Sequence, residues 1–182
     1  MRVIIQRVKG VVLSVNKEQG KGSENELEVF SKIKEGLICF IGIHKNDTWN
    51  DALYIIRKCL GLRLWSCDNK TWDKSVKDMD YELLLVSQFT LFANTKKGNK
   101  PDFHLAKEPN DALIMFNKIV NEFIKEYKKD KIKTGKFGCY MHIEAINDGP
   151  VSIIIDSHDV NLDRNDNNDN NNNNDGVISK NI

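Results

Sequence analysis

Apolar, mostly β-branched residues recur along the start of the chain in short runs broken by polar positions, the pattern of partly buried strands. Four such runs occur in two pairs: Val3–Val8 with Val11–Lys17, and Leu27–Ile33 with Leu37–Ile43. Lys9-Gly10 separates the first pair, and Lys34-Glu35-Gly36 separates the second. Short glycine-containing breaks of this kind are typical of hairpin turns. We therefore predict two β-hairpins joined by an exposed, polar loop over residues 18–26.

From Asp47 onward the apolar residues recur every three or four positions, which indicates an amphipathic helix. Asp47, or Thr48 with Asp51 three residues later, supplies the helix start, and Gly61 marks its end. A second helix is predicted from Pro109 to about Tyr127. Proline is well suited to the first turn, and one face of this segment is apolar.

Four more apolar runs complete the pattern: Leu62–Trp65, Leu83–Phe92, Cys139–Ile146 and Val151–Ile155. With the two hairpins they give about eight strands and two main helices. We predict an α+β fold in which a curled antiparallel sheet or small β-barrel carries both helices. A chain of 182 residues with 40% hydrophobic residues suits one core, so we place a single domain at residues 1–157.

Residues 158–182 differ sharply from the rest, because Asn and Asp dominate and few residues could be buried. This composition predicts a disordered tail. Without the tail, residues 1–157 contain 25 basic and 21 acidic residues, a formal charge of +4. A mildly basic surface is compatible with an RNA partner and does not require one.

The four cysteines show no C-x-x-C spacing, and three lie among apolar residues, so we expect buried free thiols. The first eight residues include Arg2, Gln6 and Arg7, which excludes a secretory apolar core there. No apolar run approaches the length of a membrane span. We therefore predict a cytoplasmic protein.

The most informative run is Leu83–Phe92, since it carries Ser87, Gln88 and Thr90 where a buried strand would be apolar. Buried polar groups need hydrogen-bond partners. Neighbouring backbone can supply them, and so can a ligand. None of the four histidines visibly pairs with an acid, and neither histidines nor cysteines cluster as in zinc sites, so we predict neither a metal nor a cofactor.

A second unusual feature is the run Asn147-Asp148-Gly149-Pro150-Val151-Ser152. A Gly-Pro pair just ahead of a strand often marks a tight turn, so the simplest interpretation is a hairpin corner. X-Pro bonds are cis in about 5–6% of cases in folded proteins.

Four segments together resemble the D-aminoacyl-tRNA deacylases, also called D-tyrosyl-tRNA deacylases. They occur in order and with compatible spacing: Met1–Val8, Leu84–Leu91, Gly135–Met141 and Asn147–Ser152. The similarity extends from Met1 to about Ser157. It implies an obligate homodimer with active sites at the subunit interface. It also implies hydrolysis of the ester that joins a D-amino acid, or glycine, to the terminal adenosine of tRNA.

The resemblance also implies roles for individual residues. Ser87, Gln88 and Thr90 would line the reaction centre, and the backbone N–H groups of the Gln88-Phe89-Thr90 run would stabilise an oxyanion. A cis Gly149-Pro150 bond would enter the partner's site and exclude L side chains, with Arg7 steadying it. Phe137 and Met141 would border the adenosine pocket.

Thr90 is one candidate nucleophile, but no base is evident near it in the sequence. The alternative is attack by water, assisted by the ribose 2′-hydroxyl of the substrate.

Some features depart from the family pattern, and two other functions remain open. Ser152 replaces a usual Thr, Trp72-Asp73 replaces a usual Met-Asn, and the tail has no family counterpart. The main alternative is a nucleic-acid-binding protein on the same fold with a role in replication. An editing module for L-aminoacyl-tRNA is disfavoured by Gly149-Pro150.

Overall fold

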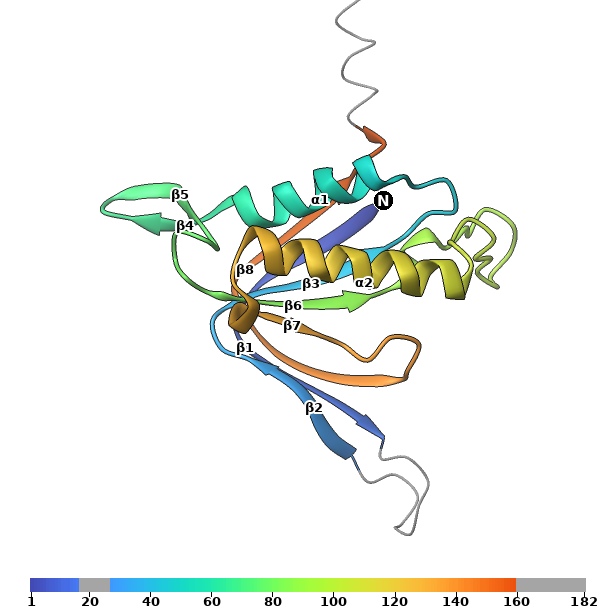
Figure 1. Cartoon of the computed structure of the whole chain (residues 1–182), viewed down its shortest axis with the longest axis horizontal. Coiled ribbons are helices and arrows are strands. Elements are labelled where there is room, and N and C mark those ends of the chain that lie inside the picture. The colour runs from blue at the N-terminus through green and yellow to red at the C-terminus, as the bar shows by residue number, and fades with distance from the viewer. Residues whose placement is uncertain (17–26, 160–182) are drawn as a thin grey trace, which may run out of the picture.

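We describe a computed structural model of residues 1–16 and 27–159 (Figure 1). The predicted loop at residues 18–26 and the tail beyond residue 159 lie outside the described residues. The main sheet runs in the order β2-β1-β3-β6-β7, and β8 pairs with the other edge of β1. Its strands are β1 (Arg2–Asn16), β2 (Leu27–Ile33), β3 (Gly36–Gly42), β6 (Glu82–Ser87), β7 (Ile132–Thr134) and β8 (Met141–Asp156).

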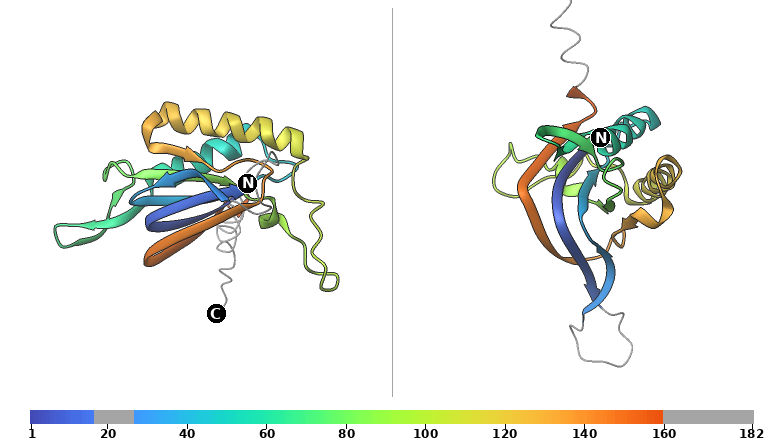
Figure 2. Two further views of the ribbon diagram at one scale, coloured as in Figure 1. Left: turned by 90° about the horizontal axis from the view of Figure 1, so that it is seen from below. Right: turned by 90° about the vertical axis from the view of Figure 1, so that its left-hand side faces the viewer.

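The predicted α+β fold is confirmed. The sheet curls into a nearly closed, barrel-like shape, and α1 (Trp49–Gly61) and α2 (Pro109–Glu126) lie together on one side of it (Figures 1 and 2). The sheet is mixed rather than wholly antiparallel, because β3–β6 and β6–β7 are parallel pairs. Parallel neighbours need long crossover connections, and α1 and α2 lie within these two connections.

The hairpin predicted around Lys9-Gly10 is wrong, because β1 passes through these residues as one strand. The pairing with β8 shifts between Val8 and Gly10, so Lys9-Gly10 forms a bulge instead of a turn. The inserted residue reverses the alternation of side chains along the strand. Val8 therefore points to the same side of the sheet as Val11, Leu13 and Val15.

The second predicted hairpin is also wrong in its pairing, although both of its strands exist. β2 and β3 each pair antiparallel with β1, along successive stretches of the same edge. They therefore run in the same direction and do not pair with each other. The polar residues Lys34 and Glu35 form a kink between two strands, which the sequence alone does not distinguish from a reversal.

The two last predicted strands are one strand, β8, with an interruption at its centre. Gln6 pairs with Ser152 and Val8 pairs with Asn147, so only Arg7 lies opposite the four residues 148–151. The predicted hairpin corner at Gly149-Pro150 is therefore a wide bulge. The Gly149-Pro150 peptide bond is cis, as the resemblance implied.

Both predicted helices are confirmed, and their apolar faces cover one face of the sheet. Asp51 accepts a hydrogen bond from the Thr48 backbone N–H at 2.8 Å and one from its hydroxyl at 2.7 Å, so this pair caps α1. Phe116, Ile119 and Phe123 of α2 are buried in the core. A second cluster, including Val86 of β6, fills the other side of the sheet. Strands β3 and β6 are covered on both faces, which explains their continuous apolar runs.

A two-stranded arm projects from this body: β4 (Arg63–Cys67) and β5 (Lys70–Ser75) pair with each other and extend beyond α1 (Figure 1). Strand β5 was not predicted, because its residues are mostly polar. The three-residue strand β7 was not predicted either. All four cysteines are free, and Cys39 and Cys59 are buried as expected, but Cys139 is exposed. Neither α1 nor α2 is long and apolar enough to cross a membrane.

Candidate active site

A cavity of about 840 Å³ lies beside the end of β6. Its walls come from the β6 end, the segment before α2, the start of α2 and the β7–β8 connection. Six of the nine residues predicted to form the site line this one cavity: Ser87, Gln88, Phe89, Thr90, Phe137 and Met141. The structure therefore brings together two motifs about fifty positions apart in the sequence.

The polar segment is presented to the cavity because β6 ends earlier than predicted. The strand stops at Ser87, and Phe89–Phe92 form a 3-10 turn, η1, rather than further strand. The Gln88 N–H donates to the Ile41 carbonyl of β3 at 2.8 Å, the last bond along this pair. The chain then crosses closely over Gly42, where a Cβ atom would lie 2.9 Å from Cβ of Leu91. The prediction of strand over residues 88–92 is wrong because β3 provides no further partner there.

The start of η1 leaves two backbone donors free. The first N–H groups of a helical turn have no acceptor within that turn. Among the described residues, the Phe89 and Thr90 N–H groups have no hydrogen-bond acceptor. The Gln88 N–H is committed to Ile41, so it cannot serve the oxyanion role that was expected of the whole run. Two adjacent free amides in residues that line one cavity suit an oxygen that gains negative charge.

The side chains beside these donors are polar but not activated as nucleophiles. Gln88 Nε2 donates to Thr90 Oγ1 at 2.5 Å. An amide N–H donated to a hydroxyl oxygen draws electron density away from it and removes no proton. No histidine lines the cavity in the part of the chain that the structure describes. Thr90 therefore lacks the adjacent base that hydroxyl nucleophiles require.

Aromatic rings form much of the remaining wall. Phe89 and Phe103 meet edge to face, with ring centroids 5.1 Å apart. Phe137 also lines the cavity, and its ring centroid lies 5.8 Å from that of Phe116 of α2. Tyr140 is 76% exposed at the same cavity. Such walls suit a flat, partly apolar group such as a nucleobase.

Several lining residues were not among the predicted site residues, including Phe103, Lys107, Glu108 and Ala112. Pro109 did indicate that a helix begins here, but no sequence pattern shows which sheet edge a helix start will meet. Lys107 is oriented by the fold, since its Nζ donates to the Lys45 carbonyl at 2.9 Å and its backbone N–H donates to Ile43 at 2.9 Å. The cavity thus contains one cationic and one anionic side chain at the start of α2.

Arg7, Gly149 and Pro150 lie elsewhere and do not line this cavity. Gly149 and Pro150 are exposed in the bulge of β8. Arg7 lies directly opposite the bulge and binds it: Nε is 3.0 Å from a carboxylate oxygen of Asp148 and 3.3 Å from its carbonyl oxygen. The same guanidinium donates to the Leu64 carbonyl and lies over the Trp65 ring at 5.9 Å. The predicted role of Arg7 beside this motif thus has a direct contact to support it.

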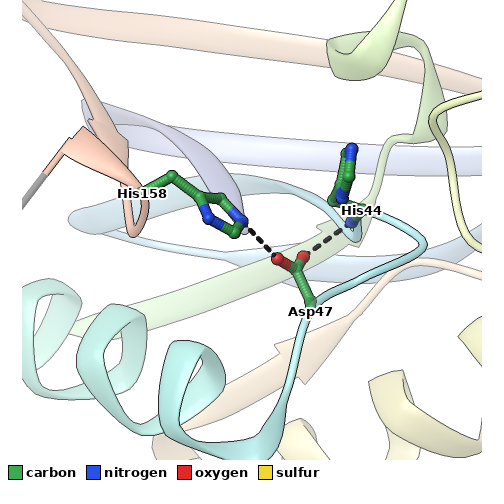
Figure 3. Close-up of side chains that lie close together, drawn as sticks. All are labelled: His44, Asp47 and His158. Atoms are coloured by element: carbon green, nitrogen blue, oxygen red, sulfur yellow. Dashed lines mark hydrogen bonds and ion pairs between the residues drawn. The ribbon is translucent and has the colours of Figure 1, made fainter. Parts of the chain in front are cut away.

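Histidines do pair with acids in the structure, contrary to the impression from sequence, but away from the cavity. His104 binds Asp102. Figure 3 shows the second pair, in which the His158 ring is directed at the Asp47 carboxylate at 2.9 Å. One ring nitrogen of His44, one of His158 and one carboxylate oxygen of Asp47 lie within 4.8 Å of one another, so these three residues could ligate a metal ion.

The Asp47 carboxylate is already engaged, however. It forms an ion pair with the buried Met1 ammonium at 2.6 Å and accepts a hydrogen bond from the His44 backbone N–H at 2.6 Å. Burial lowers the pKa of the His44 ring. This cluster therefore connects the end of β8 to the start of α1.

Comparison with known proteins decides the family. Residues 4–156 match the family described as D-Tyr-tRNA(Tyr) deacylase. The chain belongs to the D-Tyr-tRNA(Tyr) deacylase family. A D-aminoacyl-tRNA deacylase of Plasmodium falciparum (isolate 3D7) is 73% identical over 164 residues, which cover 90% of this chain and 100% of that protein. One from Dictyostelium discoideum is 49% identical, over 86% of this chain and 98% of that protein.

Solved structures agree with the fold of this deacylase family member. The structure of a protein named "c-Myc DNA Unwinding Element Binding Protein" has a TM-score of 0.76 and 39% identity, and covers 86% of this chain and 98% of its own. That of a probable eukaryotic D-amino acid tRNA deacylase has a TM-score of 0.68 at 13% identity, over 85% of this chain and 98% of its own. The deacylase family consists of hydrolases that act on ester bonds, and its substrates are tRNA-linked. The predicted enzyme class is confirmed.

Proposed function

We propose that this deacylase hydrolyses the ester of D-aminoacyl-tRNA, and of mischarged glycyl-tRNA, and spares L-aminoacyl-tRNA. The observation that carries the proposal is the pairing, in one aromatic cavity, of two free backbone donors at Phe89 and Thr90 with the adjacent polar groups of Ser87 and Gln88. A site with these parts binds a nucleoside ester and stabilises its reaction, and needs neither a metal nor a cofactor.

In the proposed complex the terminal adenosine lies against the Phe137–Met141 wall, and the ester carbonyl oxygen faces the Phe89 and Thr90 N–H groups. Water attacks the carbonyl carbon, and the oxyanion that forms accepts hydrogen bonds from both amides. The bond between the carbonyl carbon and the ribose 3′-oxygen then breaks. The ribose 2′-hydroxyl takes the proton from water and passes one to the leaving 3′-oxygen. The products are a free amino acid and tRNA.

We assign Thr90 to positioning rather than attack, because its hydroxyl accepts a hydrogen bond from Gln88 and no base among the described residues adjoins it. An ester is already activated toward water, so correct placement supplies much of the rate. The 3′-oxygen and 2′-hydroxyl sit on neighbouring ribose carbons, so the substrate brings its own proton carrier to the reacting bond.

Selectivity is proposed to come from Gly149-Pro150 of a second copy in an obligate homodimer. On its own chain this motif lies eight residues from Met141 along β8, about 25 Å of extended strand. Gly149 and Pro150 are exposed, and Arg7 fixes the preceding residue. An exposed, fixed loop that does not reach its own cavity is suited to entering another. There its carbonyl groups would hold the substrate amino group and leave no room for an L side chain.

The decisive assay follows release of amino acid from D-Tyr-tRNA and L-Tyr-tRNA by the purified protein. We expect rapid hydrolysis of the D form and slow hydrolysis of the L form, and equal rates would end the proposal of chiral selection. Glycyl-tRNA, which has no side chain to exclude, should be hydrolysed as well. Analytical ultracentrifugation tests the homodimer directly, and a monomer with full activity contradicts the shared site.

A matched pair of glycine variants tests the motif. At Gly149, where φ is +118°, an added Cβ would lie 2.9 Å from Val151 Cγ2. Gly149→Ala should therefore shift the bulge and lower the ratio of D to L hydrolysis. Gly61→Ala is the control, because its Cβ would meet nothing within 4 Å. An unchanged ratio in Gly149→Ala argues against the role of the motif.

DNA binding is a second candidate function, because the solved relative that is 39% identical to this chain is named as a DNA unwinding element binding protein. It predicts affinity for duplex DNA that does not depend on the cavity. Electrophoretic mobility shift with duplex DNA tests it, with tRNA as competitor. The cytoplasmic location remains a prediction, and imaging of the tagged protein tests it.

A further inference from the structure

A short loop beside the active-site cavity concentrates positive charge. Residues 93–107 contain four lysines and a single acidic residue, in a chain whose formal net charge is only +1. Lys96, Lys97 and Lys100 are exposed, and none forms an ion pair within the described residues. The one acid, Asp102, is already bound by His104. No described carboxylate therefore pairs directly with these lysines, although Lys97 is near enough to Asp102 to help His104 lower the pKa of that carboxyl.

The base of this loop is held in place. Asn94 and Asp102 exchange two backbone hydrogen bonds, of 2.7 and 3.0 Å, which close the loop like the end of a hairpin. Asn94 Oδ1 also accepts from the Lys96 N–H at 3.0 Å. In Figure 1 the loop lies beyond the end of β6 and near the start of α2, at the end of the molecule opposite the β4–β5 arm.

Both ends of the loop lead directly into the cavity wall. The preceding residues form η1, which carries the Phe89 and Thr90 donors. Phe103, which directly follows the Asn94–Asp102 base, lines the cavity and contacts Phe89. Any nucleic acid strand whose last nucleoside occupies the cavity must leave it past the residues at its rim. A loop that connects two parts of that rim is placed to meet the strand.

We propose that Lys96, Lys97 and Lys100 bind the phosphates of the acceptor end of tRNA as it leaves the cavity. This inference rests on the proposed function and adds a binding site for the tRNA phosphates, which the proposed function left unassigned. Lysine provides charge without reading sequence, so the loop would accept every tRNA alike. That suits an enzyme that must act on many different tRNAs.

The test compares two substrates and two triple variants. The loop variant carries Lys96→Gln, Lys97→Gln and Lys100→Gln. The control variant carries Lys34→Gln, Lys70→Gln and Lys129→Gln, which remove the same charge from exposed positions between β2 and β3, in the β4–β5 arm and in the segment after α2. The substrates are D-Tyr-tRNA and the 3′-D-tyrosyl ester of adenosine, which has no phosphate.

For D-Tyr-tRNA at 0.1 M salt we expect the loop variant to lose roughly 100- to 500-fold in kcat/KM, as three phosphate contacts would give. The slope of log kcat/KM against log salt concentration should become less steep by about 2.1–2.7. The adenosine ester should be hydrolysed at the wild-type rate, and the control variant should resemble wild type on both. Equal behaviour of the loop and control variants on tRNA overturns the proposal.

Binding of uncharged tRNA, measured by fluorescence anisotropy, separates this inference from the proposed function. If wild-type protein hydrolyses neither ester, the proposed function fails, and the anisotropy still decides the role of the loop. A selective loss of tRNA affinity in the loop variant supports it. Unchanged affinity, or equal losses in both variants, refutes it. Circular dichroism of each variant confirms that it is folded.

Discussion

Replacing Arg7 tests how the Gly149-Pro150 bulge is held. The Arg7 side chain is 17% exposed and binds three groups: the Asp148 carboxylate, the Asp148 carbonyl and the Leu64 carbonyl. Arg7→Met keeps the apolar stem and removes all three bonds. Hydrogen bonds to charged groups contribute about 1.5–3 kcal/mol each, but solvent access and the nearby Lys9 offset part of the loss. We expect the free energy of unfolding to fall by about 2–3 kcal/mol.

Arg7→Lys refines the same test. Lysine keeps the charge but lacks the planar fork that reaches both Asp148 and Leu64, so about 1–2 kcal/mol should be lost. Urea denaturation measures both values. Arg57→Met is the control, because Arg57 is exposed on α1 and surface changes usually stay within about 0.5 kcal/mol.

The Arg7 variants should lose selectivity for the D substrate as well as stability. With the bulge released, the ratio of D-Tyr-tRNA to L-Tyr-tRNA hydrolysis should fall more than the rate on the D substrate. An Arg7→Met variant within about 0.5 kcal/mol of wild type, with an unchanged ratio, would refute the assignment of Arg7 as the residue that positions the bulge.

Three further predictions concern the mechanism, pH and the core. Thr90→Ala should keep kcat within about tenfold of wild type, since the lost hydroxyl only positions the substrate. D-Tyr-tRNA ending in 2′-deoxyadenosine should react far more slowly, because it lacks the 2′-hydroxyl that carries the proton. Near-complete loss of activity in folded Thr90→Ala would restore Thr90 as the nucleophile. Burial alone would raise the pKa of Asp51, but hydrogen bonds from Thr48 and Ser157 outweigh burial and lower the pKa to about 2. The ionised Asp51 carboxylate therefore stabilises the fold above about pH 4, and this stabilisation is lost as pH falls toward 2. Urea titrations at several pH values should accordingly show the difference between wild type and Asp51→Asn shrink over that range; a constant difference contradicts it. Phe123→Ala should cost about 3–5 kcal/mol in urea unfolding, because the ring is fully buried, and a loss under about 1 kcal/mol would contradict that packing.

The helices and most strands could be predicted because their signals are local. The Thr48 and Asp51 cap and the 3.6-residue spacing act within one element. Chain reversal is different: Lys9-Gly10 and Gly149-Pro150 have turn composition but sit in bulges, because β1 and β8 remain paired on both sides of them. Pairing over more than a hundred residues decides that outcome, and local composition does not report it.

In the candidate site, too, residues with a local sequence signal could be predicted, and residues placed by tertiary packing could not. The polar residues at 87–90 were identifiable because they interrupt an apolar run. Phe103 and Glu108 were not, since the segment before α2 that carries them reaches the cavity only through tertiary packing. The separation of Gly149-Pro150 from the cavity likewise depends on the long ladder between β1 and β8.

Strand β8 has one further consequence. It carries Met141, in the cavity wall, at one end and the Gly149-Pro150 bulge at its centre, and it pairs with β1 on both sides of the bulge. In the proposed homodimer each copy of β8 would therefore touch both active sites. A substrate that displaces Met141 in one site would shift the Gly149-Pro150 bulge that enters the other site. The two sites would then respond to each other's occupancy, and the enzyme would show cooperativity between them.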